Sequence, residues 1–345
     1  MDQLVDRHTA WRLALTLHRE GADALPESWG EGRSLPLAWH VVYCQESPAR
    51  SAMAADGLPA QDPSLPEHPV YEQRLFGGAT VEWLRPPRMG ETLRCEVVPG
   101  EFSEKQGRSG PLAVYSFERH YWAGDELCVR ETSQVVYRPT PVEGGAVLGG
   151  ALAAAGDSAA TETGWLSLGT VQVDEIDVFR FSALMFNSHR VHYDLAFARE
   201  VDGHPGVLVQ AKLLLLLALE QASRQGWAVP SRLRYRAHRT VAAPAELEVQ
   251  AEFETPAGVE MQAEFETPTE DEMQSECEPP IGGETQAGSE VEAEGVRLLG
   301  EVEQLLGHEQ QIGSERQAGE ASGGQLRALR VMQGEHPCFS IEFWN

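Results

Sequence analysis

A helix-forming segment that is apolar around nearly its whole circumference sets the strongest limit on the fold of this chain. It is the stretch HPGVLVQAKLLLLLALEQASRQG, which begins at His204. Ala, Leu, Lys, Glu and Gln fill the segment and favour a helix, and Gly206 precedes it. Because the apolar character continues through Leu219, other structure must wrap this helix on most sides. Its apolar run, Leu213 to Leu219, is far too short to cross a bilayer.

The first half of the chain has a strand-like pattern after an initial helix. Residues 9–20, TAWRLALTLHRE, have helical periodicity and are followed by loops broken by Pro and Gly. From Tyr71 to Arg138, β-branched or aromatic residues alternate with polar ones, and Gly-Glu and Ala-Gly-Asp-Glu stand at the expected turns. We expect at least three antiparallel strands there, in an N-terminal domain that covers residues 1–140.

A second domain, residues 165–345, follows a linker at 141–164 that is rich in Gly, Ala, Ser and Thr. Its start, WLSLGTVQVDEIDVFRFSALMFN, predicts a strand and then a short helix. Residues 232–250 predict paired strands, and the final LRALRVMQGEHPCFSIEFWN predicts a return to a sheet.

A 12-residue tandem repeat interrupts this second domain. AEFETPAGVEMQ (251–262) is followed by AEFETPTEDEMQ (263–274) and by a diverged third copy, SECEPPIGGETQ (275–286). The repeats are rich in Glu and have little to bury. We therefore expect residues 251–325 to be a disordered or weakly ordered acidic insertion between two strands of one domain.

The net charge of the chain argues against several classes of partner, and its cysteine usage indicates the redox state of its thiols. The net charge of −26 argues against nucleic acid and against an anionic membrane surface. Residues 251–325 contribute nineteen acidic residues against two arginines, so the rest of the chain is only mildly acidic. The five cysteines form no CxxC pair, and the first residues, MDQLVD, are acidic and unlike a signal peptide. These features predict reduced thiols and a cytoplasmic protein.

The segment FSALMFNSHRVHYD, residues 181–194, concentrates titratable groups directly after an apolar stretch. Asn187 and His192 are five residues apart, and His189 lies between them, so a turn after a short helix could bring them together. A polar helix cap is an alternative, with Asn187 or Ser188 as N-cap and with His189 and Arg190 solvated. Two histidines three apart could also bind a metal, but no third ligand cluster is visible nearby.

These residues resemble a known family. FRFSALMFNSHRVHYDLAFARE, followed by a Gly and an apolar helix, resembles the hydratase signature of the MaoC-like hot-dog enzymes. The two-domain branch, with mesaconyl-CoA and itaconyl-CoA hydratases and the mitochondrial type 2 hydroxyacyl-thioester dehydratase, is similar in further motifs. These are PLAWHVVYCQES, ADGLP, RLFGGATVEWLRPPRMGE and QGRSGPLAVYSFERHY. The resemblance covers about residues 35–140 and 165–250, with the last twenty residues as a further candidate.

The resemblance implies an α+β fold of two hot-dog units, a double hot-dog in which each curved antiparallel sheet wraps a helix. The implied activity is reversible addition of water to an α,β-unsaturated acyl thioester. The unperturbed pKa of a histidine side chain lies near neutrality, so His192 suits the role of base. The backbone N–H groups of Gln210, Ala211 and Lys212, at the start of the apolar helix, would receive the developing negative charge of the thioester oxygen. Asn187 would orient the water or the carbonyl.

The chain departs from the wider family at Asn187, where single-domain relatives have an Asp, as in the pattern Asp-x-Asn-Pro-x-His. An amide cannot act as a general base. His192 must therefore do more of the proton transfer, or share this role with His189 or Asp194. His189, Arg190 and Asp194 are candidate substrate-binding residues. Arg190 could pair with a phosphate or a dicarboxylic acyl group. Asp194 also fits a structural role, as an acceptor for backbone N–H groups or for a neighbouring side chain.

The second departure is Gln210-Ala211-Lys212, where relatives have His-Gly-Pro or Gln-Gly-Pro. Ala211 adds a Cβ where backbone should approach the thioester closely. Lys212 either adds a charge to a buried region or reaches an acyl carboxylate or the nucleotide phosphates.

The leading hypothesis is therefore a hydro-lyase that acts on an acyl-CoA and needs neither a cofactor nor a metal, with a homodimer as one option for its assembly. A non-catalytic thioester-binding or scaffold protein is a second hypothesis, because Ala211 and Lys212 could have spoiled the oxyanion site. An acyl-CoA thioesterase is a third, since hot-dog folds host that chemistry too.

Overall fold

The computed structural model describes residues 2–18, 26, 29–62, 64–71, 73–107, 110–139, 164–227, 229–254 and 325–344. The chain divides into two units, and the helices and strands belong to the unit formed by Met1–Phe253 and Leu326–Asn345. The other unit, Glu254–Gln325, contains all but the first three residues of the acidic insertion predicted at 251–325, and all of this unit except its two end residues lies outside the described residues. The predicted linker at 141–164 lies outside them as well, apart from Gly164.

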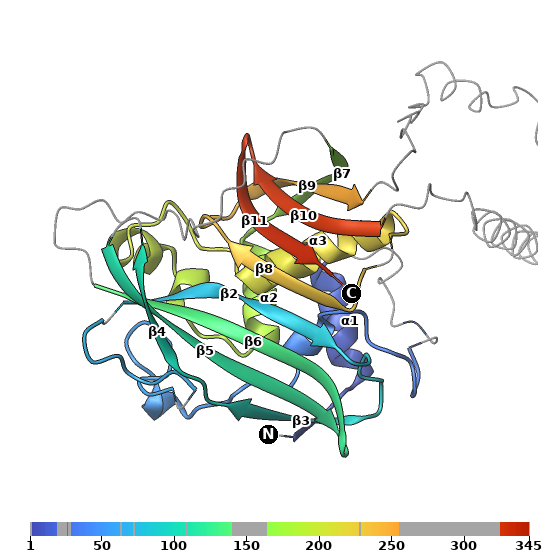
Figure 1. Cartoon of the computed structure of the whole chain (residues 1–345), viewed down its shortest axis with the longest axis horizontal. Coiled ribbons are helices and arrows are strands. Elements are labelled where there is room, and N and C mark those ends of the chain that lie inside the picture. Colours follow the sequence, from blue (N-terminus) through green and yellow to red (C-terminus); the bar gives the residue numbers. More distant parts are fainter. Residues whose placement is uncertain are drawn as a thin grey trace, which may run out of the picture. The chain divides into compact units, whose positions relative to one another are not determined.

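The strands form one sheet of eleven strands in the order β1-β3-β5-β6-β2-β8-β11-β10-β9-β7, with β4 paired to β5 (Figure 1). Their bounds in the N-terminal half are β1 Asp2–Leu4, β2 Gln73–Trp83, β3 Thr92–Val98, β4 Phe102–Gly107, β5 Gly110–Ala123 and β6 Glu126–Arg138. Those in the C-terminal half are β7 Trp165–Val173, β8 Arg232–Ala237, β9 Ala245–Glu254, β10 Gln325–Gln333 and β11 His336–Phe343. The alternating pattern between Tyr71 and Arg138 thus yields five strands, as the prediction of at least three allowed.

The two halves of the sheet join where β2 pairs antiparallel with β8, from Ala79 opposite Tyr235 to Glu82 opposite Arg232. Each half is a hot-dog sheet, and the shared β2–β8 edge makes the pair a double hot-dog. This pairing leaves no open sheet edge between the halves, so main-chain hydrogen bonds connect the two halves of the sheet directly.

The apolar segment forms α3 (Ala211–Arg224), which lies against the C-terminal half of the sheet and contacts β7, β8 and β11 (Figure 1). Every residue from Leu213 to Glu220 is buried, as expected of a helix that is wrapped on most sides. The predicted strand and short helix before it are β7 and α2 (Glu175–Leu184). Asp174 and Asp177 form a capping box at the start of α2, which fixes where that helix begins.

The N-terminal half differs from the expectation that each sheet wraps a long helix. Among the described residues before β2, the helices are α1 (Arg7–Thr16) and the 3₁₀ turns η1 (Trp39–Val42) and η2 (Arg50–Ala52). α1 packs against α2, and three of the four buried residues of η1, Trp39, Val41 and Val42, belong to the hydrophobic core. Prolines recur at positions 26, 36, 48, 59, 63, 66 and 69. Proline breaks a helix interior, so this part of the chain cannot build a second long helix.

Two details of the C-terminal half correct the sequence-based expectations. Residues 232–250 do contain two strands, but β8 and β9 are not paired with each other, because β10 and β11 lie between them in the sheet. The last twenty residues therefore do return to the sheet, as predicted. β9 also continues to Glu254, so the first residues of the predicted insertion at 251 are strand.

Candidate active site

The segment after α2 makes a tight turn that holds Asn187 and exposes little of His192. Phe186 adopts a left-handed backbone conformation with φ of 48°, which side-chain-bearing residues seldom adopt. Asn187 N–H donates to Ser182 O at 2.8 Å, and its Oδ1 accepts from His189 N–H at 3.0 Å. Asn187 therefore closes the turn between α2 and the 3₁₀ turn η3 (Arg190–His192). It is not the N-cap of either element, in contrast to the polar-cap alternative.

The His192 ring has one fixed partner, which determines its tautomer. Its Nδ1 lies 2.7 Å from Leu208 O. A carbonyl oxygen only accepts, so Nδ1 carries the proton and Nε2 presents a lone pair. Among the described residues Nε2 makes no hydrogen bond. Burial lowers the pKa of His192 to about 4, although the hydrogen bond to Leu208 opposes this shift, so the ring is neutral at pH 7.

The same contacts place His192 beside the start of α3. Leu208 N–H donates to Val191 O at 2.9 Å, and Leu208 O accepts from His192 Nδ1–H. Two hydrogen bonds therefore hold Leu208 against residues 191 and 192. Leu208 is only two residues before Gln210, the N-cap of α3. The sequence-based expectation that His192 lies near the beginning of the buried helix therefore has direct geometric support.

The N-terminus of α3 presents backbone donors. The amides of Ala211, Lys212 and Leu213 have no acceptor among the described residues, while Leu214 N–H reaches Gln210 O at 3.1 Å. First-turn amides and the helix dipole together favour a negative charge at this end. Gln210 is buried, and its Nε2 donates to Ser182 Oγ at 2.7 Å and to Val178 O at 3.1 Å. The Gln210 side chain therefore fixes the start of α3 against α2.

Arg190 and Asp194, two of the candidate substrate-binding residues, bind each other. Arg190 Nε and Nη2 donate to Asp194 Oδ2 at 3.0 and 2.7 Å, and its Nη1 donates to Ala55 O at 3.2 Å. The guanidinium also lies over the Phe197 ring, 4.4 Å from its centroid. Asp194 accepts from Phe197 N–H, and this bond and the bonds from Arg190 lower the pKa of its carboxyl. Both side chains thus brace the loop that carries His192.

His189 lies close to His192. Its ring stands edge-to-face with the His192 ring, with 5.5 Å between the centroids. Burial is the main cause that lowers the pKa of His189, so its imidazole is predominantly neutral at pH 7. It can therefore pack beside His192 without adding a positive charge.

Lys212 points away from solvent into an ion pair that the sequence-based analysis missed. Its Nζ lies 3.3 Å from Oε1 of Glu131, a β6 carboxylate that is only 1% exposed. The strand alternation carries a signal for this pair, because Glu131 stands between the inward-facing Val129 and Ser133. A charged residue at an inward position of a strand is unusual and marks a polar interior.

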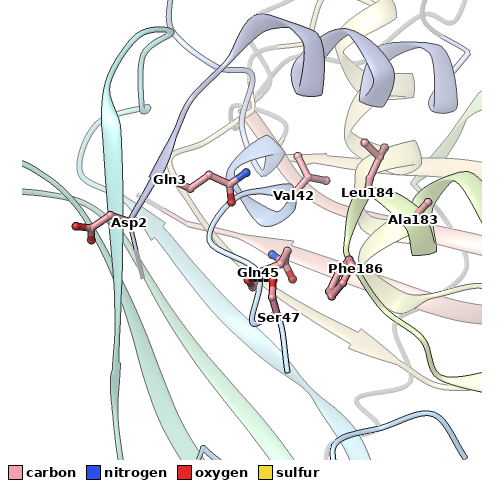
Figure 2. A pocket seen from close by; sticks show the side chains of 8 residues that line it. All are labelled: Asp2, Gln3, Val42, Gln45, Ser47, Ala183, Leu184 and Phe186. Atoms are coloured by element: carbon pink, nitrogen blue, oxygen red, sulfur yellow. Dashed lines mark hydrogen bonds between the residues drawn. The ribbon is translucent and has the colours of Figure 1, made fainter. Parts of the chain in front are cut away.

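A cleft of about 390 Å³ opens beside the end of α2 and the turn that follows it. Figure 2 shows its side chains, which come from β1, from η1 and the loop after it, and from the end of α2. They are Asp2, Gln3, Val42, Gln45, Ser47, Ala183, Leu184 and Phe186. None of the predicted site residues lines this cleft, but Phe186 directly precedes Asn187.

The part of the chain that the structure describes holds no group of three His, Cys, Asp or Glu residues placed to bind a metal ion. None of its helices combines the length and the apolar character that crossing a membrane would require.

The family is shown by a comparison with protein-family models. Residues 38–243 match the model described as hydroxyacyl-thioester dehydratase type 2. The chain belongs to this family. The matched range runs from the start of η1 to the turn before β9, so it includes the Asn187 turn, His192, the start of α3 and Glu131.

Individual relatives agree with this assignment. The chain is 35% identical over 196 residues to the mesaconyl-C(4)-CoA hydratase of Chloroflexus aurantiacus, with 54% of this chain and 64% of that protein covered. It is 22% identical over 220 residues to the mitochondrial hydroxyacyl-thioester dehydratase type 2 of Schizosaccharomyces pombe, with 54% and 66% covered. The chain thus spans slightly less than two thirds of the length of these relatives.

Among solved structures, a MaoC-like dehydratase from Phytophthora capsici has a similar fold. The two chains are 14% identical with a TM-score of 0.50, and the match covers 74% of this chain and 86% of the other. At this identity the likeness concerns the fold alone.

Proposed function

We propose that the protein catalyses the reversible addition of water to the double bond of an α,β-unsaturated acyl-CoA thioester. The observation that carries this proposal is the His192 ring, neutral and fixed by Leu208 O two residues before the N-cap of α3, whose first-turn amides have no acceptor among the described residues. Hydration needs a base for water and donors for the thioester oxygen, and this arrangement offers both.

The proposed mechanism uses one base for both proton transfers. His192 Nε2 takes a proton from water as the water oxygen bonds to Cβ. The π electrons of the double bond move toward the thioester, whose oxygen becomes enolate-like and accepts hydrogen bonds from the amides of Ala211 and Lys212. The His192 imidazolium then returns its proton to Cα and the thioester carbonyl reforms. Asn187 orients the water or the carbonyl, since an amide cannot take the proton itself.

The named relatives suggest which thioesters to test. The family description refers to hydroxyacyl thioesters, and the Chloroflexus relative to mesaconyl-C(4)-CoA. We therefore propose crotonyl-, mesaconyl- and itaconyl-CoA as the first substrates to test. We expect the reaction to proceed in solution without an added cofactor.

The decisive experiment follows enoyl-thioester absorbance and free thiol in the same reaction. We expect absorbance to fall without thiol release, and His192→Ala to lower kcat/KM by about 10²- to 10⁴-fold. His336→Gln, which changes an exposed histidine at the start of β11, is the matched control and should leave kcat/KM unchanged. Release of free thiol would instead identify a thioesterase. Binding without either change would identify a non-catalytic thioester-binding protein.

A further inference from the structure

The sequence motif ADGLP, residues 55–59, has no part in the proposed mechanism, yet the structure places it against the turn that carries His192. Residues 54–58 form a tight loop between η2 and β2 in the N-terminal half. We call these five residues the clamp loop. We call residues 188–192, which they contact, the histidine turn.

Three successive carbonyl oxygens of the clamp loop accept hydrogen bonds from the histidine turn. Ala55 O accepts from Arg190 Nη1 at 3.2 Å, and Asp56 O accepts from Arg190 N–H at 2.8 Å. Gly57 O accepts from Ser188 Oγ at 2.7 Å. Arg190 begins η3, so its N–H has no acceptor within that turn and the clamp loop supplies one.

The histidine turn is therefore held on two sides. His192 is the last residue of η3, two positions after the Arg190 N–H that the clamp loop binds. On the other side, His192 Nδ1 donates to Leu208 O at 2.7 Å. The clamp loop thus determines where the main chain of the turn lies, and Leu208 determines how the ring is rotated. Proton transfer depends on both, because a misplacement of about 1 Å can lower the rate about 10²-fold.

Gly57 is the position at which the loop approaches the turn most closely. Its φ of +84° lies in the left-handed region that favours glycine, and a Cβ there would lie 1.9 Å from Ser188 O. Real Cβ atoms essentially never come within 3.0 Å of another heavy atom. An alanine at this position would therefore separate the two backbones by roughly 1 Å.

The clamp loop holds its shape through its own hydrogen bonds. Ala54 N–H donates to Leu58 O at 2.8 Å, and Gly57 N–H donates to Ala54 O at 3.1 Å. The Asp56 carboxylate accepts from Leu58 N–H at 3.0 Å. Neither hydrophobic cluster of the described residues includes a residue of this loop, so its burial adds little to folding. The loop is therefore suited to positioning the turn rather than to building the core.

We propose that the clamp loop is a positioning element for the proton transfers: its three carbonyl oxygens, in contact with the turn because residue 57 is glycine, keep His192 at the start of α3. Asp56 and Gly57 act through the histidine turn and do not touch the substrate. The effect on hydration rests on the proposed function. The effect on the His192 ring does not, because it can be measured without any substrate.

Two glycine variants separate the lost contact from backbone strain. Gly57→Ala introduces the close approach to Ser188, whereas Gly32→Ala, at φ +80° with no atom within 4 Å of the added Cβ, introduces similar strain alone. We expect Gly57→Ala to lower kcat for crotonyl-CoA about 10²-fold with KM within about threefold, and Gly32→Ala to leave both unchanged. Equal kcat values for the two variants would overturn the proposal.

A milder pair of variants covers the case in which Gly57→Ala does not fold, as judged by circular dichroism. Ser188→Ala removes one of the three hydrogen bonds to the clamp loop and should lower kcat about fivefold, the effect of one hydrogen bond. Ser103→Ala, at an exposed serine of β4, is the matched control and should leave kcat unchanged. An unchanged kcat in Ser188→Ala would then refute the proposal.

The His192 ring gives a readout that is independent of turnover. Its ¹H–¹⁵N ring correlations, assigned by their loss in His192→Ala, report its tautomer and its pKa. In the unchanged protein and in Gly32→Ala we expect the Nδ1–H tautomer and a pKa of about 4. In Gly57→Ala we expect mixed tautomers and a pKa moved toward 6.5, because the ring leaves Leu208 O and gains water. An unchanged ring in folded Gly57→Ala would overturn the proposal.

The two proposals fail in different experiments. Hydration of crotonyl-CoA with the same kcat and the same His192 ring signals in Gly57→Ala would keep the proposed function and reject the clamp. Displaced His192 ring signals in Gly57→Ala, in a protein that hydrates no enoyl thioester, would keep the clamp and reject the proposed function.

Discussion

His192 is largely buried, and its burial decides whether the neutral imidazole or the imidazolium is present during turnover. Removal from water penalises the imidazolium, so the pKa falls from 6.5 to about 4. The neutral ring with a free Nε2 lone pair is the form that accepts a proton. A neutral ring with so low a pKa is a weak base, so the α3 amides must supply much of the transition-state stabilisation.

The pH dependence of hydration should reflect this low pKa. We expect kcat/KM to be constant from neutral pH down to well below 6.5 and to fall only as the pH approaches about 4, where His192 becomes protonated. The measurement is a pH–rate profile with crotonyl-CoA, with unfolding monitored in the same buffers by circular dichroism. An acid limb centred near 6.5 would show that water reaches the ring in the working protein.

The same shift has a defined sign for stability. The unfolded chain binds the His192 proton near 6.5 and the folded chain only near 4. The contribution of His192 to stability is therefore complete above 6.5 and is lost as the pH falls between these values.

At the scale of elements, the link between α3 and β6 depends on one ion pair. Lys212 Nζ lies 3.3 Å from Glu131 Oε1, and the carboxylate has almost no contact with solvent. A buried ion pair costs desolvation on both sides, so its presence is weak evidence of stability, whereas loss of one partner leaves a charge uncompensated.

Removal of that one partner should therefore be more harmful than removal of both charges. We expect Lys212→Met to lower the free energy of unfolding by about 3 kcal/mol, and Lys212→Met with Glu131→Gln to recover a large part of the loss. Chemical denaturation of the two single variants and the double variant gives the cycle. Additive effects of the two changes would mean that the pair contributes no coupling.

The elements themselves were predictable wherever periodicity is local. The apolar residues from Leu213 to Leu219 predicted α3, and the alternation before Arg138 predicted strands of the N-terminal half. The pairing of β2 with β8 and the separation of β8 from β9 were not predictable, because pairing partners depend on contacts between residues far apart in sequence. The ion pair of Lys212 with Glu131 was missed for the same reason.

In the whole molecule, the candidate site draws on both halves. The C-terminal half supplies His192 and the first turn of α3, and the N-terminal half supplies Glu131, which pairs with Lys212 of that turn. The sequence motif indicated the first group, since its residues are close together in the chain. The second group is separated from it by more than fifty residues. The continuous sheet through β2 and β8, together with the packing of α1 against α2, brings the two halves together.

The acidic insertion should be dispensable for this arrangement. β9 and β10 are neighbours in the sheet, and Arg330 Nε donates to Gln250 Oε1 at 2.6 Å between them. A short Gly/Ser linker in place of residues 255–324 therefore has only to join adjacent strands, and loop closure of this kind costs little.

The replacement removes seventeen acidic residues and two arginines, a net charge of −15 out of −26, and none of the candidate site residues. We expect the variant to fold, with kcat/KM for crotonyl-CoA within about threefold of the full chain, because surface charge acts on association of an anionic substrate rather than on fold. Thermal unfolding and the hydration assay measure both properties. Loss of the cooperative unfolding transition would show that residues 255–324 contribute to the core, and loss of activity with intact folding would show that they contribute to the site.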